Sequence, residues 1–212
     1  MTDTNIAAYD YAISPHDPQW PTTVHPSEIP QLLSYERPTF SDERGFFREA
    51  IEKRDLEKVL GKEITITQWN HSQSLPGVIR GFHLEPWEKL IYVPTGEVMS
   101  AIVDLRLASP TFGKVATFRL GEKNRKTLYL PKGMGNSYCV LSDTPADYMY
   151  LITAYFEGAP TPAVSWNDPM LTKQFGGWPV DHPIVSEKDM HYPTLQEKFG
   201  KEVDFSKYSW LT

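Results

Sequence analysis

The chain has little of several features that would assign it to a class at once. Cys139 is the only cysteine among 212 residues, which excludes an intrachain disulfide, and its apolar surroundings favour a core residue over a reactive thiol. No apolar run approaches the roughly 20 residues that a membrane-spanning helix needs. The first 17 residues lack the basic and apolar regions of a signal peptide. We therefore expect a cytoplasmic protein that does not interact with membranes.

Basic charge is also scarce. The chain has 21 lysines and arginines against 27 aspartates and glutamates, a formal net charge of −6, with the two signs interspersed. A nucleic-acid-binding protein typically carries a concentrated basic surface. This balance argues against DNA or RNA as a partner.

Short stretches of alternating apolar and polar residues are abundant between residues 64 and 156. Turn sequences such as PTGE, SPTFG, GEKN and PKGMG separate them. Period-two alternation with frequent turns is typical of antiparallel sandwiches and barrels. We therefore predict a mainly β fold, an antiparallel jelly-roll barrel with short peripheral helices, and from the length we expect residues 1–212 to form one domain.

The regions that flank the predicted barrel have different compositions. Residues 1–40 are rich in proline, which predicts an N-terminal arm that lies on the body or on a partner subunit. Residues 51–60 place their apolar side chains on one helical face before Gly61, which predicts a short helix. Residues 157–212, rich in Pro, Gly and Trp, are predicted to wrap the barrel and to end in a short helix at 194–199.

A lone histidine, His83, lies in the strand-like stretch VIRGFHLEPWEKLIYV (78–93). A metal site needs three or four converging N, O or S ligands. Near His83 the sequence offers only Glu85, and the turn before residue 138 supplies Asn136 where a second histidine would be useful. The sequence therefore predicts no metal, and His83 is an acid, a base or a buried core residue.

Other polar residues surround His83 in the predicted barrel. Strand alternation can bring Arg80 and Lys89 to the same barrel mouth, where two cations suit an anionic substrate or a developing oxyanion, although either one alone fits a solvated strand end. Gln68 and Asn70 share one face of an earlier strand, which is either a solvent face or a polar cavity. From the residues alone we expect a polar, cationic, metal-free pocket around His83.

Seven motifs carry a resemblance to a known family. The sequence resembles the dTDP-4-dehydrorhamnose 3,5-epimerases, metal-independent enzymes of the cupin jelly-roll superfamily that act on a nucleotide-linked 4-keto-6-deoxyhexose. The motifs, in family order over about three quarters of the chain, are SDERGFFREA (41–50), TQWNHSQSLPGVIRGFH (67–83), VDLRLASPTFGK (103–114), LPKGMGNSYCVLSD (130–143), YLITAYF (150–156), WNDPML (166–171) and VSEKD (185–189).

The resemblance implies a role for each matching residue. His83 corresponds to the general base that removes the protons at C5 and C3, and Asp189 to the carboxylate that accepts a hydrogen bond from its other ring nitrogen. Tyr150 resembles the acid that returns a proton to the opposite face, and Lys89 the cation that stabilises the C4 enolate. The positions that match substrate-holding residues are Arg44, Glu49, Gln68, Asn70, Arg80, Asn136 and Lys188.

The resemblance also implies an activity and an assembly. The expected reaction epimerises C3 and C5 of dTDP-4-dehydro-6-deoxy-D-glucose to dTDP-4-dehydro-L-rhamnose without a cofactor. The expected assembly is a homodimer with N-terminal strands exchanged between subunits. A metal-dependent cupin oxygenase and a non-catalytic sugar-binding cupin are the alternatives from other classes.

Three departures from the family pattern leave a closer alternative open. Only six positions separate His83 from Lys89, across an EPW loop typical of a subgroup. Asn136 stands in place of a family histidine, and Ser100 in place of a common acidic residue. A single-centre (3- or 5-) epimerase that acts on a related nucleotide 4-keto sugar therefore remains the alternative function.

Overall fold

The computed structural model describes residues 21–158 and 161–212. The expectations for residues 1–20 lie outside this part of the chain. The strands are β1 (Thr23–Pro26), β2 (Leu33–Glu36), β3 (Phe40–Asp42), β4 (Gly45–Phe47), β5 (Gln68–Ser74), β6 (Ile79–Leu84), β7 (Lys89–Thr95), β8 (Glu97–Asp104), β9 (Val115–Gly121), β10 (Thr127–Leu130), β11 (Met134–Val140) and β12 (Ala146–Ile152). The helices are α1 (Lys53–Leu60), α2 (Pro169–Thr172), α3 (Glu187–Met190) and α4 (Leu195–Phe199), with the 3-10 turns η1 (Lys173–Phe175) and η2 (Phe205–Lys207).

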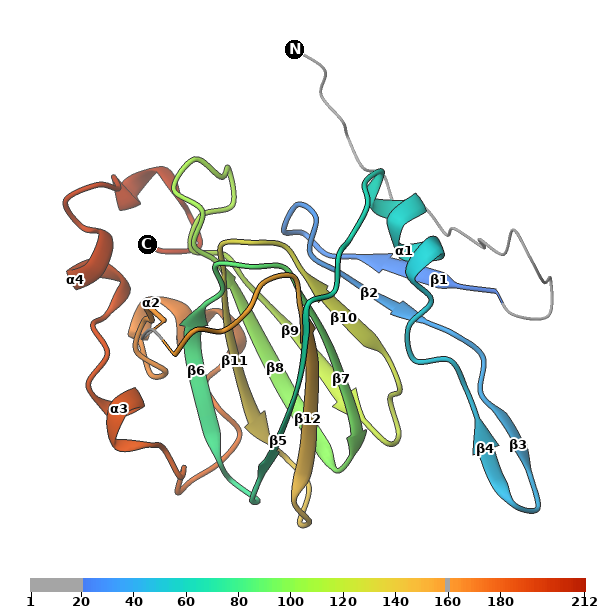
Figure 1. The fold of residues 1–212 in the computed structure, drawn as a ribbon. Coiled ribbons are helices and arrows are strands. Elements are labelled where there is room, and N and C mark those ends of the chain that lie inside the picture. The colour runs from blue at the N-terminus through green and yellow to red at the C-terminus, as the bar shows by residue number, and fades with distance from the viewer. Residues whose placement is uncertain (1–20, 159–160) are drawn as a thin grey trace.

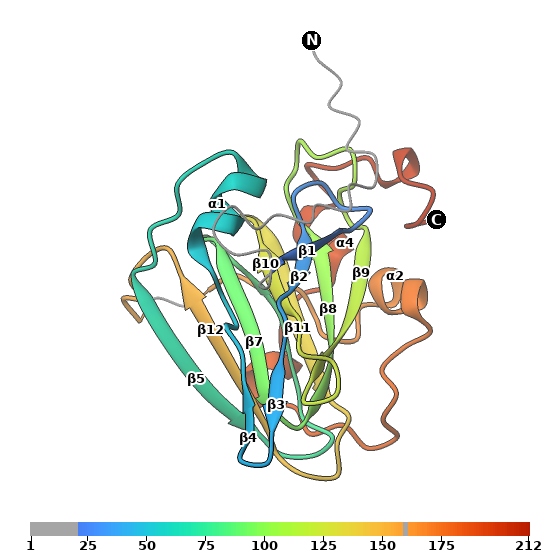
Figure 2. The same cartoon turned by 90° about the vertical axis from the view of Figure 1, so that its right-hand side faces the viewer.

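Two antiparallel sheets form the body of the molecule (Figures 1 and 2). The six-stranded sheet has the order β1-β2-β10-β7-β12-β5, and the four-stranded sheet the order β6-β11-β8-β9. Strands β3 and β4 form a separate ribbon, which projects beyond the six-stranded sheet in Figure 1. The prediction of a mainly β, cupin-like fold with short peripheral helices is confirmed.

Strand β8 shows how one sequence can have two buried faces. Val98 and Ile102 point into the core between the sheets, whereas Ala101 and Val103 belong to a second cluster with Phe112 and residues of the C-terminal segment. Successive side chains of a strand point to opposite faces, so both faces of β8 are apolar because both are covered. The C-terminal segment therefore provides an outer layer over the four-stranded sheet.

Helix α1 covers the outer face of the six-stranded sheet. Leu56 is buried there in one cluster with Leu90 of β7, and three further apolar residues of residues 51–60 pack on the same cluster. The helix begins two residues later than predicted because the Glu52 side chain accepts a hydrogen bond from the amide of Asp55 and caps it. It ends at Gly61, whose φ of +66° is left-handed.

Part of the expected N-terminal arm is a regular part of the sheet. Residues 23–26 and 33–36 form β1 and β2, and β2 pairs antiparallel with β10 of the same chain. Val24, Leu33 and Tyr35 are buried against the cluster under α1. The sequence concealed these strands because each has only four residues, too few to establish a period.

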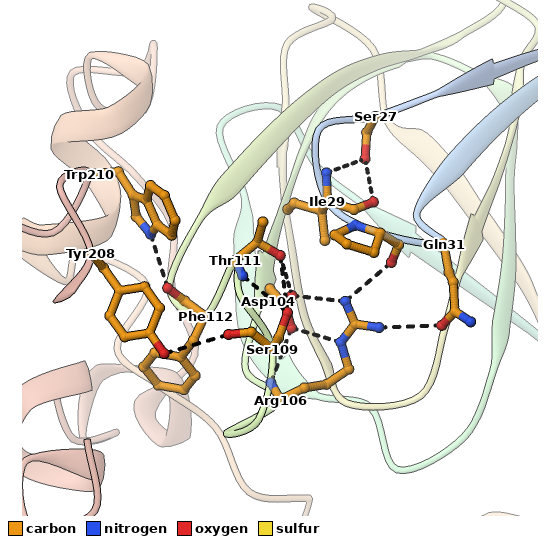
Figure 3. Close-up of polar contacts among 11 residues, drawn as sticks. Ser27, Ile29, Gln31, Asp104, Arg106, Ser109, Thr111, Phe112, Tyr208 and Trp210 are labelled. Carbon is orange, nitrogen blue, oxygen red and sulfur yellow. Dashed lines mark hydrogen bonds and ion pairs between the residues drawn. The ribbon is translucent and has the colours of Figure 1, made fainter. Parts of the chain in front are cut away.

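A buried polar cluster closes the end of β8 (Figure 3). Asp104 accepts hydrogen bonds from the backbone and guanidinium of Arg106 and from the hydroxyls of Ser109 and Thr111. Arg106 also donates to the carbonyl of Pro30, which ties this turn to the segment between β1 and β2.

The sequence also predicted a buried cysteine and a short helix near the C-terminus. Cys139 is buried, and burial raises the pKa of its thiol to about 11, so the prediction of a core cysteine is confirmed. The expected C-terminal helix is α4, with Thr194 and Glu197 as a reciprocal capping box. None of the described helices is long and apolar enough to cross a membrane.

Candidate active site

A pocket of about 150 Å³ lies between the ends of the two sheets. Four residues expected at the site line it, from four different strands or strand ends: Asn70, His83, Lys89 and Tyr150. The rest of its lining is a carboxylate and a largely apolar wall, made by Glu85, Trp87, Ile152, Phe156 and Thr161.

His83 is held in place by the backbone of β6 and its neighbours. Gly81, two residues before it, has a φ of +118°, and a Cβ atom there would lie 2.3 Å from the carbonyl oxygen of Asn136. Only glycine allows this close approach between β6 and β11. On the other edge of β6, Phe82 and Val164 exchange two backbone hydrogen bonds of 3.0 Å. The RGFH sequence therefore fixes the strand that carries the imidazole.

Asp189 reaches His83 from the C-terminal segment. Ser186 caps the short helix α3 by accepting a hydrogen bond from the Asp189 amide. The Asp189 carboxylate then accepts one hydrogen bond of 2.9 Å from His83 Nε2 and another of 3.3 Å from the Gly81 amide. With Nε2 donating to Asp189, Nδ1 is the imidazole nitrogen that can take a proton.

The environment of Asp189 favours its charged form. Burial alone would raise the pKa of the Asp189 carboxyl, but the hydrogen bond and charge of His83 and the Gly81 amide outweigh burial and lower it. The carboxylate therefore stays ionised and accepts the hydrogen bond from the imidazole N–H, which orients the ring. Tyr192 completes the setting with its ring edge-on to His83, at 6.1 Å between centroids.

Tyr150 lies on β12, in the sheet opposite His83. Burial raises the pKa of its phenol, as do the charge of Glu85 and the neighbouring Tyr138, while Arg80 acts in the opposite direction. The phenol therefore keeps its proton over a wider pH range than a free tyrosine. Lys89 Nζ lies 4.2 Å from the centroid of the Tyr150 ring, within range of a cation–π contact.

Lys89 has a partner, Glu85, for which the sequence indicated no role other than that of a single candidate metal ligand. Glu85, only 3% exposed, forms an ion pair with Lys89, which is 6% exposed. The two residues are four positions apart across the EPW loop, and both line the pocket. Two opposite charges that flank a tight turn within strand-like sequence were the available signal for this pair.

Three expected substrate-holding residues lie beside the pocket rather than in its lining. Gln68 donates to the Asn70 side chain at 2.6 Å. Arg80 is exposed and donates to Ser74 at 3.0 Å. Asn136 is buried and accepts a hydrogen bond from the Tyr148 hydroxyl, at the position paired with His83 in the β6–β11 ladder.

The other three expected residues lie farther out. Arg44, on the turn of the β3–β4 ribbon, has a side chain that is 83% exposed and pairs with Asp42. Glu49 pairs with the buried Arg37. Lys188 is exposed beside Tyr192, 5.8 Å from its ring centroid. Within one chain, none of the three lines the pocket.

The donor set of the pocket suits proton transfer better than metal binding. Within residues 21–158 and 161–212, no group of three His, Cys, Asp or Glu side chains is arranged to hold a metal ion. An orientable imidazole, a phenol with a raised pKa and an ammonium group in one cavity are the parts of an acid–base site.

Comparison with known proteins identifies the relatives of this chain. A dTDP-4-dehydrorhamnose 3,5-epimerase from Shigella flexneri is 37% identical over 169 residues, covering 78% of this chain and 91% of that protein. A dTDP-4-dehydrorhamnose 3-epimerase from Streptomyces niveus is 32% identical, covering 74% and 76%. The crystal structure of a dTDP-6-deoxy-D-glucose-3,5-epimerase from Legionella pneumophila Philadelphia 1, in complex with dTDP-4-keto-L-rhamnose, has a TM-score of 0.77 at 31% identity, covering 88% and 97%.

A family model supports the same assignment. The model described as dTDP-4-dehydrorhamnose 3,5-epimerase matches residues 26–197, which include every expected site residue. The resemblance drawn from the sequence motifs is thereby confirmed. The chain belongs to the dTDP-4-dehydrorhamnose 3,5-epimerase family.

Proposed function

We propose that this enzyme epimerises C3 and C5 of dTDP-4-dehydro-6-deoxy-D-glucose to give dTDP-4-dehydro-L-rhamnose. The observation that carries the proposal is the pocket in which His83, backed by Asp189, faces Tyr150 and Lys89. Epimerases of this family, identical at about a third of positions over most of the chain, support the reaction. The chemistry requires no cofactor, because the 4-keto group itself acidifies the protons at C3 and C5.

The two sheets supply the two proton-transfer groups. His83 lies on β6 of the four-stranded sheet, and Tyr150 on β12 of the six-stranded sheet. His83 Nδ1 takes the proton from carbon, and the electron pair of the broken C–H bond moves into the C4 carbonyl to form an enolate. Tyr150 then gives its hydroxyl proton to the opposite face of the carbon, and the ketone re-forms with inverted configuration.

Lys89 stabilises the intermediate in this scheme. A proton next to a ketone is too weakly acidic for imidazole unless the enolate oxygen is stabilised as it forms. Lys89 is the ammonium group in the pocket lining, so we assign it this role. The sugar and the nucleotide are held, in the same proposal, by Arg44, Glu49, Gln68, Asn70, Arg80, Asn136 and Lys188.

The position of the β3–β4 ribbon favours a homodimer. Arg44 and Glu49 do not line the pocket of their own chain, yet both belong to the motif that resembles a substrate-binding element. The ribbon projects from the body (Figure 1). Phe46, on this ribbon, is 51% exposed. A partner copy that inserts this ribbon into the pocket would complete the site. Light scattering at micromolar concentration should give the mass of a dimer, and a monomer would contradict this part of the proposal.

The same proposal treats residues 1–212 as one catalytic domain, with an N-terminal arm at 1–40 and a C-terminal wrap at 157–212. Packing of Leu171, Leu195 and Phe199 on the four-stranded sheet supports the wrap. We further propose that the enzyme works in the cytoplasm. Its one cysteine is buried, so the fold does not depend on an oxidising compartment.

A single-centre reaction is the second candidate. The relative from Streptomyces niveus is named as a 3-epimerase and is 32% identical to this chain. Asn136 and Ser100 both contact the hydroxyl of the buried Tyr148, so the positions that depart from the family pattern lie in one hydrogen-bonded group near the pocket. A change there could restrict which carbon reaches His83.

Proton NMR in D2O distinguishes the two candidates. dTDP-4-keto-6-deoxyglucose is incubated with the protein, and the C3 and C5 proton signals are followed against an enzyme-free control. Loss of both signals with appearance of dTDP-4-dehydro-L-rhamnose is the expected result. Loss of one signal identifies a single-centre enzyme, and retention of both contradicts the proposed function.

The variant Tyr150→Phe tests the acid in the same assay. Without the phenolic proton, product formation should fall about 10²-fold or more, while dTDP binding measured by calorimetry stays within about threefold. His83 still removes the proton, so deuterium should enter the unreacted substrate without inversion. Product formation at the wild-type rate would show that another group returns the proton.

A further inference from the structure

The Glu85–Lys89 ion pair is the strongest unassigned feature of the pocket. Both side chains are more than nine-tenths buried, and both line the cavity next to His83 and Tyr150. A buried ion pair is costly to desolvate and is often no more stabilising than an apolar pair of the same volume. Stability alone is therefore a weak reason for this pair to lie in the pocket.

Backbone hydrogen bonds hold the main chain of both Glu85 and Lys89. The Glu85 amide donates to the carbonyl of Met134 at 2.7 Å, and the Glu85 carbonyl accepts from the Gly133 amide at 2.8 Å. Lys89 begins β7 and is paired in register with Leu130 on one side and Ile152 on the other. Both ends of the turn that starts at Glu85 and leads to Lys89 are thus hydrogen-bonded to neighbouring strands or turns.

The Glu85 carboxylate constrains where the ammonium group of Lys89 can lie. A lysine side chain has four rotatable carbon–carbon bonds, so the position of its ammonium group is not fixed by the backbone. Here Lys89 Nζ contacts the Glu85 carboxylate and lies 4.2 Å from the Tyr150 ring centroid. These two contacts together restrict the position of Nζ in the cavity.

We propose that Glu85 is a positioning residue that holds the ammonium group of Lys89 beside Tyr150 and compensates its charge until the enolate forms. The inference rests on the proposed function. In the resting pocket Lys89 is neutralised by Glu85, so the site does not bind a random anion. When negative charge develops on the C4 oxygen, the ammonium is already in position and no water needs to reorganise.

The same carboxylate affects the acid. Glu85 contributes to the raised pKa of Tyr150, after burial, so its charge helps the phenol to keep its proton. Removing that charge while retaining the hydrogen-bond acceptor should let the phenol ionise at lower pH. The charged and titratable groups around Tyr150 are Glu85, Lys89, His83, Arg80, Tyr138 and Tyr148.

Two substitutions of Glu85 separate positioning from charge. Glu85→Ala removes the contact, and kcat should fall about tenfold or more while KM changes less than about threefold. Glu85→Gln retains an oxygen for Lys89, and the alkaline limb of the pH profile of kcat should move to lower pH. Glu88→Gln is the matched control, because Glu88 lies three residues further on, pairs with Lys62 and does not line the pocket.

A double-mutant cycle tests whether Glu85 acts through Lys89. Lys89→Met should lower kcat about 10²-fold, and Glu85→Ala/Lys89→Met should be no slower than Lys89→Met alone by more than about twofold. A purely structural role predicts instead that the two losses multiply, or that kcat of Glu85→Ala equals that of the wild type. Either result would overturn the inference. Thermal unfolding of each variant identifies any that fail to fold, and Glu85→Gln then supplies the test.

These outcomes are separate from the test of the reaction itself. If the wild-type protein exchanges no proton at C3 or C5, the proposed function is wrong. If the wild type is active and Glu85→Gln leaves both kcat and the alkaline limb unchanged, the reaction stands and the role of Glu85 is wrong.

Discussion

Asp189 and Asp104 are both buried aspartates on the four-stranded side of the molecule, and both have a pKa below the usual range. They differ in their partners. Asp189 pairs with His83, whose side chain is 33% exposed to the pocket. Asp104 pairs with Arg106, which is always charged, and accepts two further hydroxyl hydrogen bonds (Figure 3). The same residue type therefore serves two different sites.

The difference lies in what each carboxylate leaves free. A histidine can lose or gain a proton near neutral pH, so a carboxylate behind it orients a base. An arginine cannot be deprotonated, so a carboxylate that faces it completes a closed network. We therefore expect changes at Asp189 to affect turnover and changes at Asp104 to affect stability.

His83→Ala should have the largest effect. Loss of the general base should lower kcat at least about 10³-fold, because His83 is the one imidazole among the described residues that line the pocket, and Glu85, the carboxylate there, is paired with Lys89. The melting temperature should also fall, because the buried Asp189 loses the partner that offsets its burial, so thermal unfolding is measured beside kcat to show that the variant is folded. His71→Ala is the matched control, because His71 pairs with Asp147 on an exposed face. Retention of more than a few per cent of activity in His83→Ala would sink the assignment of the base.

Asp189→Asn should come next. The amide cannot stabilise an imidazolium ion, and it allows the wrong ring nitrogen to carry the proton, so kcat should fall about 10²-fold. Steady-state kinetics on the purified variant measure the loss. The exposed His71–Asp147 pair again offers a control, and Asp147→Asn should leave kcat within about twofold of the wild type. Equal losses in the two variants would remove the distinction between an orienting carboxylate and a surface ion pair.

The sequence predicted the barrel and the residues of the orienting pair, His83 and Asp189. Alternation and turns predicted the barrel. The motifs identified His83, Tyr150 and Asp189, although Tyr150 lies 67 positions after His83 and Asp189 lies 106 positions after it. Contact between His83 and Asp189 does not follow from local pattern, because a helix of four residues from the C-terminal segment makes it. The family resemblance, rather than periodicity, supplied that pair.

Several long-range contacts could not be predicted from the sequence pattern. Glu85 was weighed only as a metal ligand, because its burial depends on how the EPW loop is held against Gly133 and Met134. The local pattern did not show strands β1 and β2, because four-residue strands rich in polar neighbours resemble loops, and only the resemblance implied strands in the N-terminal part. Arg44 and Glu49 matched a motif, but a single chain does not bring them to the pocket. Short-range sequence patterns carry no information about contacts of this kind.

Asp104→Asn should separate stability from activity. The amide loses the charge that faces Arg106, which should lower the free energy of unfolding by about 2 kcal/mol and the melting temperature by about 5 °C, with kcat unchanged. Hydrogen bonds from Arg106, Ser109 and Thr111 outweigh burial and hold the pKa of Asp104 low, so the unfolded state binds more protons in acid. Wild-type stability therefore falls as the pH drops below about 4 and through the lowered pKa.

Denaturant titrations at several pH values test this dependence. The variant should show a flatter loss of stability in acid than the wild type, since the group that titrates is absent. Asp143→Asn, at an exposed position, is the control for a change of one surface charge. An Asp104→Asn variant with wild-type stability at neutral pH and a wild-type acid slope would show that the network in Figure 3 is not what stabilises this turn.

Trp210→Phe should have the smallest effect that remains measurable. Trp210 Nε1 donates to the Phe112 carbonyl at 2.9 Å, and its removal should cost about 1 kcal/mol and about 3 °C in melting temperature. Tyr208→Phe is the matched control, because the Tyr208 hydroxyl lies 3.5 Å from the Ser109 carbonyl and makes a weaker bond. Differential scanning calorimetry should therefore rank Asp104→Asn, Trp210→Phe and Tyr208→Phe in decreasing order, all with full activity. If Tyr208→Phe were as costly as Trp210→Phe, hydrogen-bond geometry would not explain how the C-terminal segment holds this end of the barrel, and the apolar packing of the three rings at Phe112 would have to carry it.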